Sequence, residues 1–165
     1  MEAALQVSRR AAQLRRDFDS SFANPPPAGG ETGQDLLAIR VGTGKFAIRL
    51  SEIAGLYVDK KITPVPGAAA GMLGIAGFRG SILPVYDLQS LLDHSNGPAL
   101  RWLVVAAAAP VAFSFEAFEE QLRVSPRAIK CERAQAKGGL KEFVQSDGVL
   151  RPIIRLSSVL ESLTT

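Results

Sequence analysis

The residues that could carry out catalysis are few, and they stand in no catalytic pattern. His94 is the single histidine, and it lacks cysteines or carboxylates at metal-ligand spacing and a nucleophile near it in the sequence. The serines considered as nucleophiles occur in no nucleophile-elbow motif: Ser20, Ser21, Ser51, Ser81, Ser90 and Ser95. We therefore predict a protein that is not an enzyme and holds neither a cofactor nor a metal.

An acidic cluster offers closely spaced carboxylates that could exchange protons. Glu116, Glu119 and Glu120 stand close to Arg123. Carboxylates two to four residues apart beside an arginine are typical of a solvated, salt-bridged surface rather than of an acid–base pair. Cys131 is the only cysteine, so it cannot form an internal disulfide, and we expect a small, partly buried apolar side chain.

The glycine-rich segment at residues 71–80 does not fit a phosphate-binding loop, because it has no lysine–serine end and opens onto a strand. It predicts a hairpin instead. Residues 71–75 form one strand, Gly77-Phe78-Arg79-Gly80 the turn and residues 81–86 the returning strand. Pro84 indicates an edge position or a bulge. Arg79 at the tip is either a solvated surface charge or an anchor for a protein partner.

Composition limits the class of protein. The chain has 165 residues, 47% hydrophobic and 21% charged, a normal balance for one domain or two small ones sharing a core. No apolar run approaches the roughly 20 residues of a membrane helix, so we expect a cytoplasmic protein that does not insert into the membrane. The net charge of +3 suggests nucleic-acid binding as an alternative, but the cations are scattered and favour a solubilising surface.

The elements required to position Arg79 are mainly strands. Residues 1–19 predict a helix or a disordered tail, and residues 20–34 a Pro/Gly-rich linker. Strands follow at 36–41 and 45–50, with Phe46, Ile48 and Leu50 predicted to face inward. A helical turn is expected at 51–56, a strand at 57–62 and a short helix at 88–92. The second half adds strands at 100–107, 111–115, 121–124, 142–145 and 149–154 and a helix at 157–163. About five strands in each half predict an all-β fold with short helices and two small five-stranded barrels.

The two halves, residues 35–95 and 96–160, also resemble each other. When the sequence is aligned with itself at a shift of 65 residues, residues 46–48 fall on 111–113 and Ile53 falls on Phe118. A shift of 68 residues places Gly80 on Gly148 and Pro84 on Pro152. We interpret this as an internal duplication, and two like units predict a groove between them in which partners bind.

The folded part, residues 35–165, resembles the CheW family of chemotaxis coupling proteins. The resemblance rests on residues 46–53 (FAIRLSEI), 62–67 (ITPVPG) and above all 71–88 (GMLGIAGFRGSILPVYDL). It implies two intertwined five-stranded barrels and a non-catalytic adaptor. Such an adaptor joins the cytoplasmic tip of a chemoreceptor, received in the groove between the barrels, to the regulatory domain of a CheA-type histidine kinase, which pairs with a barrel end. Recruitment to membrane receptor arrays follows from that role.

The resemblance also implies a partner-binding region around the hairpin: Ile53, Gly74, Gly77, Phe78, Arg79 and Gly80. The chain departs from its relatives there, since Gly77 and Phe78 replace an asparagine and an aliphatic residue, and Gly55 replaces an acid. Two alternatives therefore stand beside the coupling adaptor. One is an accessory CheW-like protein of a non-flagellar pathway that binds a single usual partner, and the other is a small-barrel nucleic-acid-binding protein.

Overall fold

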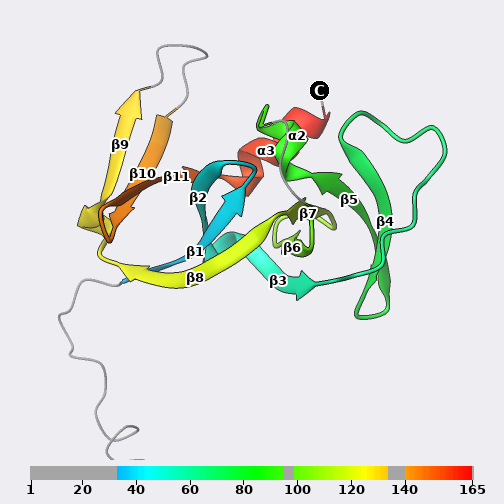
Figure 1. The fold of residues 1–165 in the computed structure, drawn as a ribbon, viewed down its shortest axis with the longest axis horizontal. Helices are drawn as coiled ribbons and strands as arrows, with labels where there is room; N and C mark the ends of the chain where they lie inside the picture. The colour runs from blue at the N-terminus through cyan, green and yellow to red at the C-terminus, as the bar shows by residue number, and fades with distance from the viewer. Residues whose placement is uncertain (1–32, 95–98, 134–139, 165) are drawn as a thin grey trace, which may run out of the picture. The chain divides into compact units, whose positions relative to one another are not determined.

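The computed structural model describes residues 33–94, 99–133 and 140–164, and within them most residues lie in two β-sheets (Figure 1). The predicted N-terminal helix and nearly all of the linker lie outside the described residues. The first strand of the described residues, β1, begins at Gln34, one residue before the predicted start of the folded part. The expectation of an all-β fold with short helices is confirmed.

Sheet A has six strands in the order β8-β1-β2-β11-β10-β9, and sheet B has five in the order β3-β6-β7-β5-β4. The strands of sheet A are β1 (Gln34–Val41), β2 (Gly44–Arg49), β8 (Ala117–Val124), β9 (Ile129–Arg133), β10 (Leu140–Ser146) and β11 (Val149–Ile154). Those of sheet B are β3 (Ile53–Val58), β4 (Met72–Phe78), β5 (Ser81–Asp87), β6 (Trp102–Ala106) and β7 (Ala112–Phe115).

Short helices connect these strands. They are η1 (Leu50–Glu52), α2 (Leu88–Leu91), η2 (Pro126–Ala128) and α3 (Leu156–Thr164). Asp87 begins α2 as its N-cap, since its carboxylate accepts a hydrogen bond of 2.9 Å from the backbone N–H of Gln89. The helical turn expected at 51–56 is wrong in extent, because η1 ends at Glu52 and Ile53 already begins β3.

The sheets are interlaced, so the sequence halves 35–95 and 96–160 do not coincide with them. Sheet A takes β1 and β2 from the first half and its other four strands from the second, while sheet B takes β6 and β7 from the second half. Sheet A also has one strand more than predicted. This strand is β9, four of whose five residues are exposed, and its only apolar residues are Ile129 and Cys131, too short an alternation to indicate a strand.

The topology repeats in the way that the sequence does. Val85 of β5 forms a parallel pair with β7, and its counterpart in the repeat, Ile153 of β11, forms a parallel pair with β2. The hairpin turns correspond as well: Arg79 and Gly80 have φ of 46° and 84°, and Asp147 and Gly148 have 49° and 74°. The predicted duplication therefore agrees with the strand order of both sheets.

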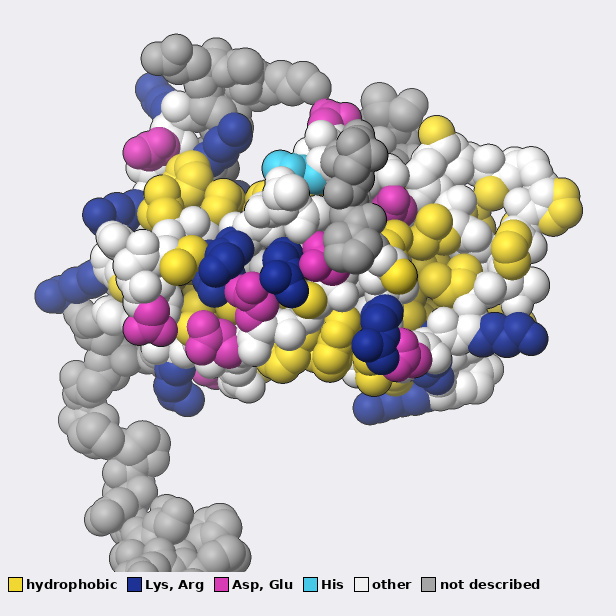
Figure 2. Space-filling model, in the orientation of Figure 1, with side chains coloured by type: hydrophobic (Ala, Val, Ile, Leu, Met, Phe, Trp, Pro, Cys, Tyr) yellow, Lys and Arg dark blue, Asp and Glu magenta, His cyan; other side chains and the backbone are white. Residues whose placement is uncertain are grey.

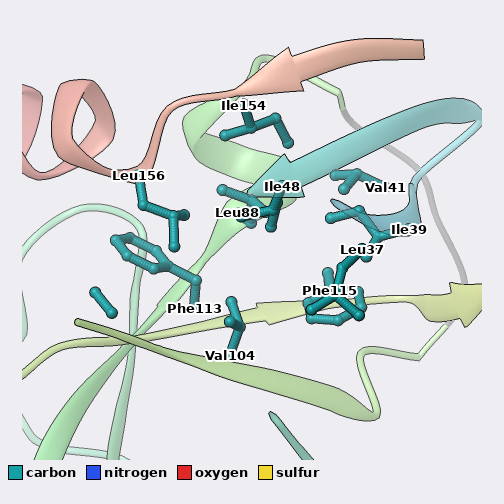
Figure 3. Close-up of a cluster of buried hydrophobic side chains, with 11 residues drawn as sticks. Leu37, Ile39, Val41, Ile48, Leu88, Val104, Phe113, Phe115, Ile154 and Leu156 are labelled. Atoms are coloured by element: carbon teal, nitrogen blue, oxygen red, sulfur yellow. The ribbon is translucent and has the colours of Figure 1, made fainter. Parts of the chain in front are cut away.

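Three apolar clusters stabilise this arrangement. The largest joins the two sheets and the helices, and Figure 3 shows its side chains converging from β1, β2, β6, β7, α2 and α3. A second cluster lies on the other face of sheet A, and a third lies on the other face of sheet B. The prediction that β2 buries a single face is therefore wrong. Ile48 packs in the joint cluster and Ala47 in the cluster of sheet A, and neither residue is exposed.

Candidate partner-binding surface

Arg79 lies at the tip of the β4–β5 hairpin, in a turn shorter than predicted. Phe78 pairs with Ser81, so the turn consists of Arg79 and Gly80 alone. Both have positive φ, as a type I′ turn requires, and this turn matches the twist of the flanking strands. Arg79 is exposed, and among the described residues it has no ion-pair partner. The guanidinium is therefore available to a carboxylate or carbonyl of another molecule.

Phe78 belongs to the core of sheet B and not to the turn. Its side chain is 4% exposed and meets the ring of Tyr57 edge-on, with 4.9 Å between ring centroids. The ammonium of Lys60 lies over both rings, 5.2 Å from the centroid of Tyr57 and 5.6 Å from that of Phe78. The interpretation of Phe78 as a surface contact is thus corrected: the ring anchors the end of β4 from which Arg79 projects.

Gly77 is also a strand residue, and it lies on the exposed face of the hairpin. It pairs with Ile82 of β5, whose side chain is 71% exposed, the largest value among the large hydrophobic residues that the structure describes. A Cβ at Gly77 would meet open space. The glycine therefore leaves the flank of Ile82 uncovered, and the hairpin offers an apolar side chain a few residues from Arg79.

Gly74 is buried, so it cannot contact a partner itself and can only influence the position of neighbouring residues. Its φ is 149°, and a Cβ there would overlap the carbonyl of Thr63 and come within 3.0 Å of the Cα of Pro64. Thr63 exchanges two backbone hydrogen bonds with Ile75, of 2.8 and 2.9 Å. The glycine thus allows the segment that follows β3 to lie against β4 and cover this edge of the sheet.

Ile53 shares a face of sheet B with the exposed residues of the hairpin. It pairs with Ala106 of β6, and the N–H of Ala106 donates to the carbonyl of Val111, just before β7. Ala112 of β7 pairs with Val85 of β5, so the residue before it, Val111, lies beside Pro84. Pro84 in turn pairs with Ile75 of β4. One row of side chains therefore crosses all five strands: Ile53, Ala106, Val111, Pro84 and Ile75.

This row, which we name the outer row, is only partly covered: Ile53, Ala106 and Val111 lie in or against the cluster that joins the two sheets, whereas Pro84 and Ile75 lie beyond it. Ala76 and Val85 belong to the third cluster described above, so Ile75 and Pro84, which alternate with them, point to the opposite face of sheet B. Ala106 is buried, and the other four residues are half-buried. Figure 2 shows hydrophobic side chains gathered over the β4 and β5 region of Figure 1. The outer row and Ile82 together give an apolar surface that runs from β3 to the hairpin.

Pro84 occupies an interior strand, since β5 lies between β4 and β7. Ile75 directs its N–H and C=O to Thr63, so Ile75 and Pro84 form a non-hydrogen-bonded pair. The missing N–H of Pro84 therefore faces the β7 side, where pairing begins one residue later, at Val85. Of the two predicted alternatives, an edge position is wrong for β5, whereas the β4–β5 pairing does contain a bulge, between Met72 and Gly74, next to the residue that pairs with Pro84.

Many cations of the described part are neutralised by carboxylates. Asp59 accepts hydrogen bonds of 2.8 and 2.6 Å from Arg101. These bonds are the main reason why the pKa of Asp59 is lowered and the pKa of Arg101 is raised. Further ion pairs are Arg40–Glu116, Arg49–Glu142, Arg151–Glu119 and Arg155–Glu142. Figure 2 shows dark blue and magenta side chains in contact at several places. These arginines are therefore engaged by carboxylates of the same chain.

The remaining candidate chemical groups are placed as follows. Glu116 and Glu119 are ion-paired as predicted, but with Arg40 and the 4%-exposed Arg151 instead of Arg123, and their side chains are largely buried. Cys131 is exposed, contrary to the expectation of a partly buried thiol. Among the described residues no cluster of three histidine, cysteine or acidic side chains could hold a metal ion. In the same part of the chain, no helix has the length and apolarity needed to span a bilayer.

The family model of the CheW-like domain matches residues 35–164, which is most of the chain. The protein belongs to the CheW family. At the level of the family it is therefore a scaffold, or adaptor, of chemotaxis signalling and not an enzyme.

Individual proteins of known name agree with this assignment. The chain is 28% identical over 142 residues to the chemotaxis protein CheW of Rhizobium meliloti, covering 79% of this chain and 89% of that protein. A probable chemotaxis protein CheW of Rhizobium etli is 28% identical over 75 residues, or 45% of this chain and 48% of the relative. The crystal structure of the scaffolding protein TtCheW from Thermoanaerobacter tengcongensis has the same fold, with a TM-score of 0.66 at 16% identity over 78% of this chain and 93% of TtCheW.

Within this CheW-like domain the structure separates the six predicted site residues. Gly77, Arg79 and Gly80 are exposed at the hairpin, Ile53 lies half-buried at the far end of the outer row, and Gly74 and Phe78 are buried supports. Sequence reasoning missed Ile82. An isoleucine two residues after a turn glycine, on the side of the strand opposite Leu83, was the available signal.

Proposed function

We propose that this CheW-like protein couples chemoreceptors to a CheA-type histidine kinase. The single observation that carries the proposal is the apolar surface of sheet B, formed by the outer row and Ile82, with the unpaired Arg79 at its end. Burial of apolar area drives association, and an arginine at the edge of such an area adds a charge-assisted hydrogen bond that fixes orientation.

The two partners are assigned to different parts of this surface. The outer row, with Ile53 at one end, receives apolar side chains from the helical tip of a receptor. The hairpin tip, with Arg79, Gly80 and Ile82, faces the regulatory domain of the kinase. Binding both at once brings kinase and receptor together without any covalent step, and it recruits the protein to receptor arrays at the membrane.

A matched pair of variants tests the use of the hairpin. Ile82 and Leu150 occupy equivalent places in the repeated hairpins, and both are exposed, by 71% and 56%. Ile82→Glu should weaken kinase binding about tenfold or more, whereas Leu150→Glu, which makes the same chemical change on sheet A, should leave it within about twofold. Binding would be measured by isothermal titration with the purified receptor tip and the kinase regulatory domain.

Arg79 is tested separately. Arg79→Ala should cost about 2 kcal/mol of binding free energy if the arginine is a central anchor, and Arg79→Glu should cost more. Kinase and receptor binding equal to wild type for both variants would contradict the anchor. If the wild-type protein bound neither the receptor tip nor the kinase domain, the coupling function itself would be contradicted. If it bound only one of them, it would be an accessory CheW-like protein.

A further inference from the structure

An apolar groove lies on sheet A, and it shares no lining residue with the surface assigned above. It has a volume of about 680 Å³ and is formed by β2, β10, β11, the start of α3 and the residues that follow α2. Its apolar lining includes Phe46, Phe143, Pro152 and Val159, all of which are half-buried. His94 closes one side, and its ring meets Phe46 edge-on at 5.2 Å between centroids. Half-buried aromatic and aliphatic side chains around a concave site are typical of a binding site.

The groove corresponds to the outer row of sheet B in the internal repeat. The shift that relates β5 to β11 places Pro84 on Pro152 and Ile75 on Phe143, and the slightly smaller shift places Phe46 on Val111. The chain therefore builds the same apolar surface twice. On sheet A it is larger in side chains, since isoleucine and valine are replaced by phenylalanine.

The backbone around the groove cannot accept an added strand. β11 forms its floor and is hydrogen-bonded to β2 on one side and to β10 on the other. Because β11 is an interior strand and not an edge of sheet A, we expect a partner to bind here through side chains, as an amphipathic helix does in a groove.

Charge indicates which kind of helix fits. Lys45 and Lys141 are exposed on the rim, and Arg155 also lines the groove. Glu142 is the only acidic residue among the described lining residues, and its carboxylate is already engaged by Arg49 at 2.8 Å and by Arg155 at 2.9 Å. The described rim therefore offers positive charge with no acid free to repel a negatively charged partner.

We propose that this groove binds an acidic amphipathic helix of a partner protein, with its apolar face on Phe46 and Phe143 and its carboxylates toward Lys45 and Lys141. This site goes beyond the coupling function proposed for sheet B and does not depend on it. Its existence would give the protein a binding surface on each sheet.

The test uses the full chain and a fluorescein-labelled helical peptide of about 18 residues, with leucines along one face and glutamates on both flanks. Fluorescence anisotropy should show saturable binding. Lys45→Glu and Lys141→Glu should each weaken binding several-fold, while Lys61→Glu, the same exchange at an exposed site after β3, should not change it. Ser158→Glu adds an acid at the groove in the first turn of α3, a position that helices tolerate, and should weaken binding about tenfold.

Each outcome decides the proposal. No saturation up to about 1 mM peptide would overturn it. Equal binding of a peptide in which lysine replaces every glutamate would also overturn it, because the basic rim would then have no role. So would equal weakening by Lys61→Glu, which would show attraction to net charge alone. Because these variants change exposed side chains, circular dichroism should show an unchanged fold, and the Ile82→Glu variant should bind the peptide as wild type does.

Discussion

The carboxylate of Glu142 should contribute strongly to stability, and the effect should depend on pH. Glu142 is buried on β10 and lies between Arg49 of β2 and Arg155, which follows β11. The hydrogen bond from Arg49, followed by that from Arg155, lowers the pKa of Glu142 from 4.5 to about 2. At about 1.4 kcal/mol for each pKa unit, the charged form contributes about 3 kcal/mol to the free energy of unfolding.

The sign of the pH dependence follows from the lowered pKa. In the unfolded chain Glu142 loses its proton near pH 4.5, whereas in the folded protein it does so already near pH 2. The stabilisation is therefore complete above about pH 4.5 and is lost as the pH falls toward 2. Since a domain of this kind has a total stability of about 5–15 kcal/mol, the loss is a large fraction of it.

Urea denaturation of wild type and Glu142→Gln at several pH values measures this contribution. At pH 7 the variant should be less stable by about 3 kcal/mol, and the difference should shrink steadily below pH 4.5. Asp59→Asn is the control, because it breaks the Asp59–Arg101 pair, which is close in geometry but more than half exposed on both sides. This control should lose far less stability. A loss below about 1 kcal/mol for Glu142→Gln, or one that is the same at pH 7 and pH 3, would refute the reasoning.

Three further predictions concern the hairpin. Gly74→Ala should lower the melting temperature and speed hydrogen exchange of the Thr63 and Ile75 amides, because the new Cβ overlaps the Thr63 carbonyl. Unchanged exchange would mean that the segment around Thr63 moves aside without cost. Phe78→Ala should cost about 3–5 kcal/mol in urea denaturation, since it removes a core ring, and a cost below about 1 kcal/mol would contradict its anchoring role. Arg79→Gly should raise stability by up to about 1 kcal/mol in thermal denaturation, because it relieves a positive φ, while still weakening partner binding; a loss of stability would contradict this.

Local signals were sufficient to predict much of the fold. The hairpin turns, the proline in β5 and the turn glycines that recur in the second half all act on their immediate neighbours, so the sequence displays them directly. Burial of both faces of β2 could not be read in this way. Ala47 is covered by Ile153 and by other residues distant in the sequence, and an alternation of large and small side chains does not reveal such a neighbour.

The candidate site was predictable in its location but not in the roles of its residues. The glycine-rich motif identified the hairpin, yet whether Phe78 points outward or inward depends on Tyr57 and Lys60, which belong to another strand and the loop after it. The ion-paired Arg49, Glu142 and Arg155 come from three segments, and their separation in the sequence gives no sign that they meet.

The interlacing of the two sheets has a consequence for how the protein is made. Gln34, at the start of the first strand, finds its partner in Val124, and Ala47 finds its parallel partner in Ile153, near the end of the chain. Neither sheet can be completed until much of the polypeptide has left the ribosome, and contacts so far apart in the sequence form slowly. The apolar strands of a nascent chain therefore stay uncovered until their partners are made, and in this interval the chain is prone to aggregate.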